Sequence, residues 1–239
     1  MKIISLWSGP RNVSTALMYS FAQRKDTKVI DEPLYAYYLE ITGAEHPGRE
    51  EVLADMSSDG NKVLEDIINS TSDQNLFLKN MAHHWIDLKD DFLDHFSNIF
   101  LIRNPVEMLP SLNKQLQSPV LRDTGLKKQV DLFKHLKSRG QTPMIIDSKR
   151  LLQNPSELLK AACESLDLPF DNNMLQWKAG ARPEDGIWHK YWYHNVHKSE
   201  GFGKYQEKNE PFPDHLKPLL EECLPYYEFL LDQSLNYSS

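Results

Sequence analysis

Short, continuously apolar runs alternate with longer helical patterns along the chain. The runs are mostly β-branched or aromatic and lack polar alternation, which is typical of strands buried on both faces of a parallel sheet. The predicted strands are Lys2–Trp7, Thr27–Ile30, Leu76–Lys79, Asn98–Ile102 and Pro143–Ile146. The alternation predicts an α/β fold in which helices flank a central parallel sheet.

Polar side chains follow every predicted strand. They are Ser8, Asp31, Asn80, Arg103 and Asp147. Ligands of open α/β sheets gather at the carboxyl ends of the strands, so these residues mark the predicted site. Asp31 and Asp147 can be interpreted as the metal-holding acids of a kinase, but we favour structural or substrate roles for them.

Helical spacing dominates between the strands. One apolar face is formed by Leu158, Leu159, Ala162, Cys163 and Leu166, and two further helices are predicted in "REEVLADM" and "KVLEDIIN". A last helical face runs from Leu216 to Tyr227, where Pro218 and Pro225 are expected to break or kink it. In "RNPVE" and "QNPSE" an asparagine, a proline and a glutamate stand in the order of a capped helix start.

Composition narrows the class of protein. The 239 residues, with 40% hydrophobic and 26% charged, predict a single domain over residues 1–239. The net charge of −7 argues against general binding to nucleic acid or anionic membranes. The chain has two cysteines and no run as long as a membrane span, so we expect a cytoplasmic protein. A homodimer is left open.

The stretch "SGPRNVST" has the order of a phosphate-binding loop between a strand and a helix. It lacks the G-x-x-x-x-G-K-[ST] signature of a nucleotide triphosphate loop, because Arg11 precedes Ser14 and Thr15 where a lysine would stand. Backbone N–H groups of Asn12 to Thr15, Val13 included, can surround an anion at the helix start.

A second anion element is predicted at "IFLIRNPVEMLPSL". Arg103 ends a strand directly before a helix N-terminus, and Ser111 lies two helical turns beyond Asn104 on the same face. A guanidinium there adds a bidentate partner for an anion. The alternative is an arginine that pairs with a nearby carboxylate and a serine exposed on a helix.

Together these segments resemble the sulfotransferase family, whose donor is 3′-phosphoadenosine 5′-phosphosulfate (PAPS). "SGPRNVST" is similar to the family's 5′-phosphosulfate loop, and Arg103 with Ser111 has the spacing of its 3′-phosphate element. "DSKRLLQNPSELLKAACESLDLPF" is similar to a later strand–loop–helix segment of the family. The resemblance spans roughly residues 1–170. It implies a three-layer P-loop fold, PAPS as donor and a small-molecule hydroxyl as acceptor.

The resemblance also implies roles in the site. Arg11 reaches the leaving phosphate oxygen, and no metal is expected, since the sulfuryl group carries less charge than a phosphoryl group. A basic or glycine-containing C-terminal segment often completes the 3′-phosphate site, which makes Lys198 and Ser199 candidates.

Two departures from better-known cytosolic members leave the base open. Those members have a lysine where this chain has Arg11, and a Lys-x-His stretch where this chain reads "LKNMAHHW". Lys79 matches, but Met81 takes the histidine's place. Glu32, His83 and the adjacent His84 are therefore the candidate bases, with Glu32 favoured. His83 would need little tuning because imidazole titrates near neutrality.

The acceptor region is predicted from "GIWHKYWYHNVHKSEGFGKY". Trp188, Tyr191 and Trp192, with Glu32 and His84, are candidate acceptor contacts, and the rings can hold a quaternary ammonium group. A packing role for this aromatic cluster is the alternative. The histidines 189, 194 and 197 also suggest metal ligands, but their spacing predicts no compact site.

Two other functions stay open. A small-molecule kinase would need ATP and Mg²⁺, and the missing GK[ST] argues against it. An inactive sulfotransferase-like domain would bind the nucleotide without turnover.

Overall fold

The computed structural model describes residues 1–70, 73–207 and 210–235. Its strands form one parallel sheet in the order β2-β3-β1-β4-β5. The strand bounds are Ile3–Ser8 (β1), Thr27–Asp31 (β2), Asn75–Met81 (β3), Ser97–Ile102 (β4) and Met144–Asp147 (β5). All five predicted strands are thus confirmed, and with them the α/β fold with a central parallel sheet.

Helices connect the strands. Their bounds are Ser14–Ala22 (α1), Tyr35–Thr42 (α2), Arg49–Asp55 (α3), Gly60–Ile68 (α4), Pro105–Asn113 (α5), Leu121–Thr124 (α6), Leu126–Ser138 (α7), Ser148–Gln153 (α8), Pro155–Ser165 (α9), His189–Trp192 (α10) and Lys217–Asp232 (α11). Short 3₁₀ turns are Ala82–His84 (η1), Asp90–His95 (η2), Asn172–Leu175 (η3), Val196–Lys198 (η4) and Asp214–Leu216 (η5). Within the described ranges no helix is both long and apolar enough to cross a membrane.

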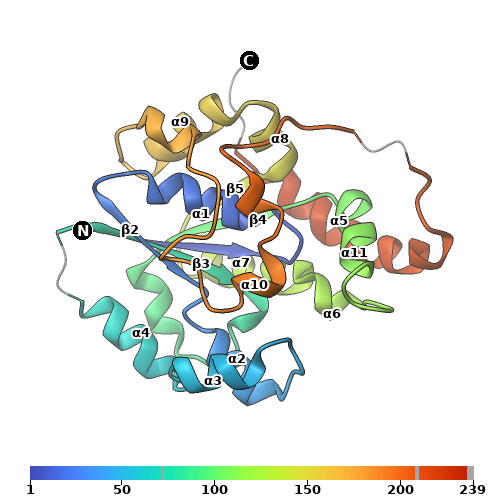
Figure 1. Cartoon of the computed structure of the whole chain (residues 1–239), viewed down its shortest axis with the longest axis horizontal. Helices are drawn as coiled ribbons and strands as arrows, with labels where there is room; N and C mark the ends of the chain where they lie inside the picture. Colours follow the sequence, from blue (N-terminus) through green and yellow to red (C-terminus); the bar gives the residue numbers. More distant parts are fainter. Residues whose placement is uncertain (71–72, 208–209, 236–239) are drawn as a thin grey trace.

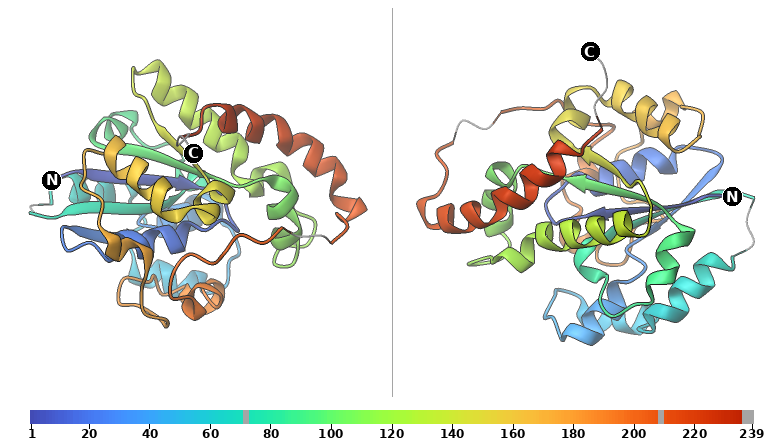
Figure 2. Two further views of the ribbon diagram at one scale, coloured as in Figure 1. Left: turned by 90° about the horizontal axis from the view of Figure 1, so that it is seen from above. Right: turned by 180° about the vertical axis from the view of Figure 1, so that it is seen from behind.

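Helices cover both faces of the sheet and make three layers (Figure 1). On one face Ile4 and Leu6 of β1 pack with the apolar sides of α1, α8 and α9. On the other face Trp7 packs with α4, α5, α7 and α11, and Figure 2 shows α7 and α11 lying across this side. The free cysteines Cys163 and Cys223 are buried in opposite layers.

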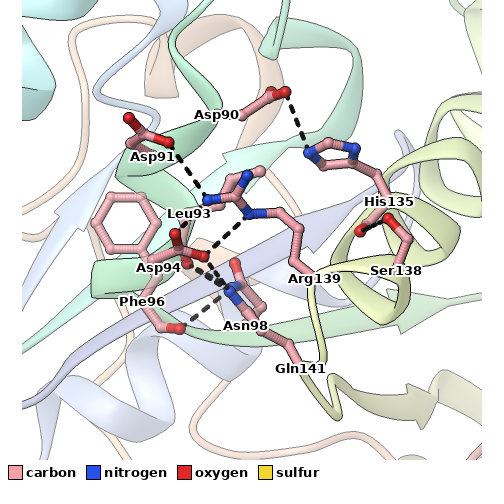
Figure 3. Close-up of polar contacts among 10 residues, drawn as sticks. All are labelled: Asp90, Asp91, Leu93, Asp94, Phe96, Asn98, His135, Ser138, Arg139 and Gln141. Carbon is pink, nitrogen blue, oxygen red and sulfur yellow. Dashed lines mark hydrogen bonds and ion pairs between the residues drawn. The ribbon is translucent and has the colours of Figure 1, made fainter.

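Polar contacts hold the end of α7 against the start of β4 (Figure 3). The amide of Asn98 donates to Gln141 Oε1 at 2.9 Å and accepts from the indole of Trp7 at 2.8 Å. Arg139 pairs with Asp94. These contacts lie at the amino end of β4, so they support the fold at the edge opposite the carboxyl ends of the strands.

The predicted helix starts are confirmed. Asn104 accepts from the N–H of Val106 at 2.9 Å, and Asn154 accepts from the N–H of Glu157 at 3.4 Å. Of the expected break or kink in the last helix, the break is wrong. Pro218 falls in the first turn of α11, where a missing N–H costs nothing, and the helix continues through Pro225.

Candidate active site

The loop between β1 and α1 is held from the side of β4. Ser14 begins α1, whose N-terminus receives no side-chain cap from the described residues. Arg11 has a φ of 54°, and Arg103 Nη1 donates to its carbonyl oxygen at 2.7 Å. Asn12 Nδ2 donates to the carbonyl oxygen of Leu101 at 2.8 Å. The two predicted anion-binding elements, the loop after β1 and the segment that begins with Arg103, are therefore in direct contact.

One predicted backbone donor of the loop is already engaged. The N–H of Val13 donates to Oδ1 of Asn12 at 2.8 Å. The first-turn N–H groups of Ser14 and Thr15 belong to an uncapped helix N-terminus, where the helix dipole favours an anion. These two residues are the better candidates for phosphate contact.

Two guanidinium groups lie close together beside this loop. Arg11 Nε donates to the hydroxyl of Ser111 at 3.0 Å, and Arg103 lies 3.5 Å from Oε2 of Glu107. Burial lowers the pKa of Arg11, and the charge of Arg103 lowers it further. Two cations, with one carboxylate that also accepts a hydrogen bond from Tyr205, make a site that an anion would stabilise.

A buried charge network links the ends of β2 and β3. Lys79 Nζ lies 2.9 Å from Oδ1 of Asp31 and 2.5 Å from Oε1 of Glu32, and it donates to the hydroxyl of Tyr193 at 2.6 Å. That hydroxyl donates to Asp31 Oδ2 at 2.7 Å and accepts from the indole of Trp188 at 3.2 Å. Asp31 is thus bound within the protein, which agrees with the structural role, one of the two roles that the sequence analysis favoured for it.

One ammonium group in this network faces two carboxylates. Burial raises the pKa of Glu32, with Asp31 adding to the rise and Lys79 opposing it. Burial alone would lower the pKa of Lys79, but Asp31 and Glu32 outweigh it and hold that pKa well above its usual value. Asp31 also accepts hydrogen bonds from the hydroxyl of Tyr193 and from the N–H of Gly186 at 3.1 Å, so Lys79 is not its only donor.

The two histidines of η1 are less basic than expected. Burial, then His46, lowers the pKa of His83 to about 4, so near-neutral titration of this residue is contradicted. Burial and the neighbouring His83 lower the pKa of His84 well below its usual value. His84 stacks on Tyr38 with ring centroids 4.6 Å apart. Both imidazoles are therefore neutral at pH 7 and form an uncharged wall.

Most of the predicted site residues border one cavity of about 1320 Å³. They are Arg11, Asn12, Val13, Ser14, Thr15, Glu32, Lys79, His83, His84, Arg103, Trp188, Trp192 and Ser199. This volume exceeds the roughly 300–1,000 Å³ typical of a pocket for one small ligand, so it has room for two.

Three predicted residues lie elsewhere. Ser111 stands behind Arg11 as its hydrogen-bond partner. Tyr191 turns away from the cavity, where its ring lies under Lys190 and its hydroxyl is 3.4 Å from Glu51. Lys198 is exposed in η4 and outside the cavity wall.

Some cavity residues escaped the sequence analysis. Tyr35, Tyr38 and His46 line the cavity from α2 and the loop after it, and Lys204 lines it in place of Lys198. The tyrosines follow Glu32 in "EPLYAYYLE" at a three-residue spacing, which places both on one helix face and could have indicated them.

Asp147 does not have the surroundings expected of a kinase's metal-holding acid, and the three histidines of the segment 189–197 do not gather into one group. Asp147 caps α8 by accepting the N–H of Arg150 at 3.0 Å, and it accepts the hydroxyl of Tyr227 at 3.0 Å. It is therefore a structural acid. His189 and His197 do come together, but their third neighbour is Asp185, and His194 is exposed.

Comparison with known proteins gives a family and relatives. A family model described as a sulfotransferase domain matches residues 1–233. Two relatives come from Arabidopsis thaliana, and each is 40% identical to this chain. Branched-chain-amino-acid aminotransferase-like protein 1 matches over 240 residues, or 100% of this chain. Branched-chain-amino-acid aminotransferase-like protein 2 matches over 232 residues, or 96% of this chain. The chain spans only 43% and 41% of the length of these relatives.

Solved structures share the fold. A sulfotransferase from Alicyclobacillus acidocaldarius aligns with a TM-score of 0.56, at 11% identity and over 98% of both chains. The sulfotransferase domain from the curacin biosynthetic pathway aligns with a TM-score of 0.54, at 15% identity, over 92% of this chain and 96% of that domain. At these identities the likeness concerns the fold alone.

Proposed function

Because the chain belongs to the sulfotransferase domain family, we propose that it moves a sulfuryl group from PAPS to a hydroxyl of a small-molecule acceptor. The observation that carries the proposal is the pair of interacting guanidiniums, Arg11 and Arg103, which line the same cavity as Glu32. A donor with a 5′-phosphosulfate and a 3′-phosphate carries negative charges that can form charge-assisted hydrogen bonds with both guanidiniums.

The donor lies with its phosphates over the loop and the start of α5. Ser14 and Thr15 hold the 5′-phosphate through their hydroxyl and N–H groups. Arg103, just before α5, takes the 3′-phosphate, and Lys204 adds a third cation from the C-terminal segment, while Ser111 of α5 supports the site through Arg11. In this arrangement Arg11 sits between the two phosphates, since Ser111 already fixes its Nε.

Glu32 is the group we assign as base. The bond from sulfur to the donor's phosphate oxygen breaks as the bond from sulfur to the acceptor oxygen forms, and the acceptor's proton moves to Glu32. A raised pKa improves a carboxylate as a proton acceptor near neutral pH. Lys79 is a positioning residue that holds Glu32 at 2.5 Å. His83 is a poorer base because its pKa is about 4.

Charge on the leaving oxygen is met by Arg11. Its guanidinium is a fixed planar donor that stays protonated, so it stabilises the bisphosphate product without transferring a proton. Arg103 donates to the carbonyl oxygen of Arg11 at 2.7 Å and so holds the backbone of Arg11 in position before the donor binds.

The acceptor occupies the aromatic part of the cavity. Tyr35, Tyr38, Trp192 and the neutral imidazoles of His83 and His84 offer flat, uncharged surfaces. Such walls suit a small alcohol with an aromatic portion or a quaternary ammonium group.

The test is transfer from PAPS labelled in its sulfuryl group to a panel of small aromatic, aliphatic and choline-like alcohols. We expect labelled product together with adenosine 3′,5′-bisphosphate, and formation of both slowed about 10²–10⁴-fold in Glu32→Gln. Binding of the bisphosphate without transfer to any alcohol would favour an inactive domain. Phosphoryl transfer from ATP with Mg²⁺ would favour a kinase.

A further inference from the structure

Three side chains that the proposed reaction does not use gather on the segment before and after α10. Asp185, His189 and His197 each present an atom able to ligate a metal, and these atoms all lie within 4.8 Å of one another. One pair, His197 Nε2 and Asp185 Oδ2, lies 3.0 Å apart. The residues lie outside the wall of the large cavity, so they form a separate group.

Backbone hydrogen bonds bring these distant positions together. The N–H of His189 donates to the carbonyl oxygen of Gly186 at 2.9 Å, and the N–H of His197 donates to that of Tyr193 at 2.9 Å. The carbonyl oxygen of His197 accepts from the N–H of Gly180 at 2.7 Å. The segment therefore folds back on itself, and the 3-residue and 7-residue gaps between the ligands close into one cluster.

The surroundings of Asp185 and His189 resemble a prepared ligand set. The carboxylate of Asp185 is fully buried, and the hydroxyl of Tyr19 donates to Oδ1 at 2.6 Å. This contact orients the carboxylate, as outer partners of metal ligands do. Nδ1 of His189 is buried and has no hydrogen-bond partner among the described residues. A buried imidazole nitrogen without a partner is costly unless something coordinates it.

We propose that Asp185, His189 and His197 bind one Zn²⁺ ion. Two imidazole nitrogens with one carboxylate oxygen suit Zn²⁺, whereas Mg²⁺ and Ca²⁺ prefer oxygen ligands. Zinc bonds of about 2.0–2.1 Å in a tetrahedron put ligand atoms about 3.3 Å apart. The pair at 3.0 Å is already near that spacing, and because all the ligand atoms lie within 4.8 Å of one another, closing the set around an ion requires at most about 1.5 Å of movement for any pair.

The ion fixes the segment that closes the acceptor side of the cavity. Between the ligands lie Trp188 and Tyr193, whose indole and hydroxyl join the Lys79 network. The N–H of Gly186, next to Asp185, donates to Asp31 at 3.1 Å. Tyr19 belongs to α1, so the ion also ties this segment to the helix that follows the phosphate loop.

The experiment is titration of the chelator-treated protein with CoCl₂, followed by visible absorption, and with ZnCl₂, followed by calorimetry. We expect one equivalent of each ion to bind, with Co²⁺ showing the strong bands of a low-coordinate site. The affinity for each ion should fall about tenfold to 100-fold or more in His189→Ala and in His197→Ala. His194→Ala is the matched control, because His194 is an exposed histidine of the same segment. It should bind as the wild type does.

A wild-type protein without stoichiometric binding would overturn the proposal, whatever the variants do. It would also be overturned if both histidine variants kept full affinity, or if His194→Ala lost it. Far-UV circular dichroism checks that each variant is folded, and Tyr19→Phe, which leaves all three ligands in place, should weaken Co²⁺ binding about tenfold. The readout is the metal alone, so its result is independent of whether sulfuryl transfer occurs.

Discussion

Arg103 has two proposed roles, which are binding of the donor's 3′-phosphate and support of the loop through the carbonyl of Arg11. The variant Arg103→Ala should tell which of them matters for affinity. The Arg103 side chain is 19% exposed, and it contacts both the carbonyl of Arg11 and the carboxylate of Glu107. Loss of a charge-assisted hydrogen bond to a phosphate costs about 1.5–3 kcal/mol. That corresponds to a roughly tenfold to 150-fold weaker affinity for adenosine 3′,5′-bisphosphate.

The assay is calorimetry with two ligands on two proteins. Adenosine 3′,5′-bisphosphate and 5′-AMP differ only in the 3′-phosphate, so the ratio of their affinities isolates that group. If Arg103 binds the 3′-phosphate, the variant loses affinity for the bisphosphate and little for 5′-AMP. Arg139→Ala removes an equal charge at the other end of the sheet and should change neither affinity.

Two results would refute this reasoning. An equal loss for both ligands would mean that Arg103 only supports the carbonyl of Arg11 at 2.7 Å. Equal wild-type affinities for the bisphosphate and 5′-AMP would mean that the 3′-phosphate is not recognised. In that case PAPS is not the donor, and the guanidinium pair serves another anion.

The remaining predictions concern the base, the sheet and the loop. Glu32→Gln should slow single-turnover transfer by about 10²–10⁴ and keep bisphosphate affinity. Burial raises the pKa of Glu32 above its usual 4.5, so wild-type rates should rise with pH through the raised value, a limb that the variant should lack. A raised carboxyl pKa stabilises the fold at low pH, so denaturant titrations should show wild-type stability falling relative to the variant as pH increases above 4.5. Asn98→Ala leaves the buried indole N–H of Trp7 without its acceptor. The free energy of unfolding should therefore fall by about 1–3 kcal/mol, with unchanged affinity for the bisphosphate. In Gly9→Ala the new Cβ would lie 2.5 Å from the carbonyl oxygen of Thr124, so bisphosphate affinity should drop; an unchanged affinity would show that the loop adjusts freely.

The sheet could be predicted because burial on both faces leaves a direct mark on the sequence. Continuous apolar runs located every strand to within a few residues, and the Asn-Pro pairs located the starts of α5 and α9. The loop and Arg103 were also predictable, since both sit at strand ends that a parallel sheet brings to one edge.

Contacts between distant segments could not be predicted in the same way. Nothing in "WHKYWYHNVH" indicates that Tyr193 reaches Lys79, 114 positions earlier, or that Asp185 joins His197. The pKa of His83 depends on burial under α2 and on His46, which a local pattern does not report. Lys198 and Tyr191 were misplaced because short turns at 189–198 decide which side chains face the cavity.

The backbone at the two central residues of the site explains why local propensity says little there. Arg11 has a φ of 54° and Glu32 a φ of 40°, in the left-handed region that costs such residues of order 1–3 kcal/mol. The fold holds both in place: Arg103 fixes the carbonyl of Arg11, and the N–H of Glu32 donates to the carbonyl of Lys79 at 2.7 Å. A glycine would adopt either conformation without strain but would supply neither guanidinium nor carboxylate. The chain therefore retains the strained residue type at the two positions where side-chain chemistry is needed, and the neighbouring strands, rather than the local sequence, stabilise that choice.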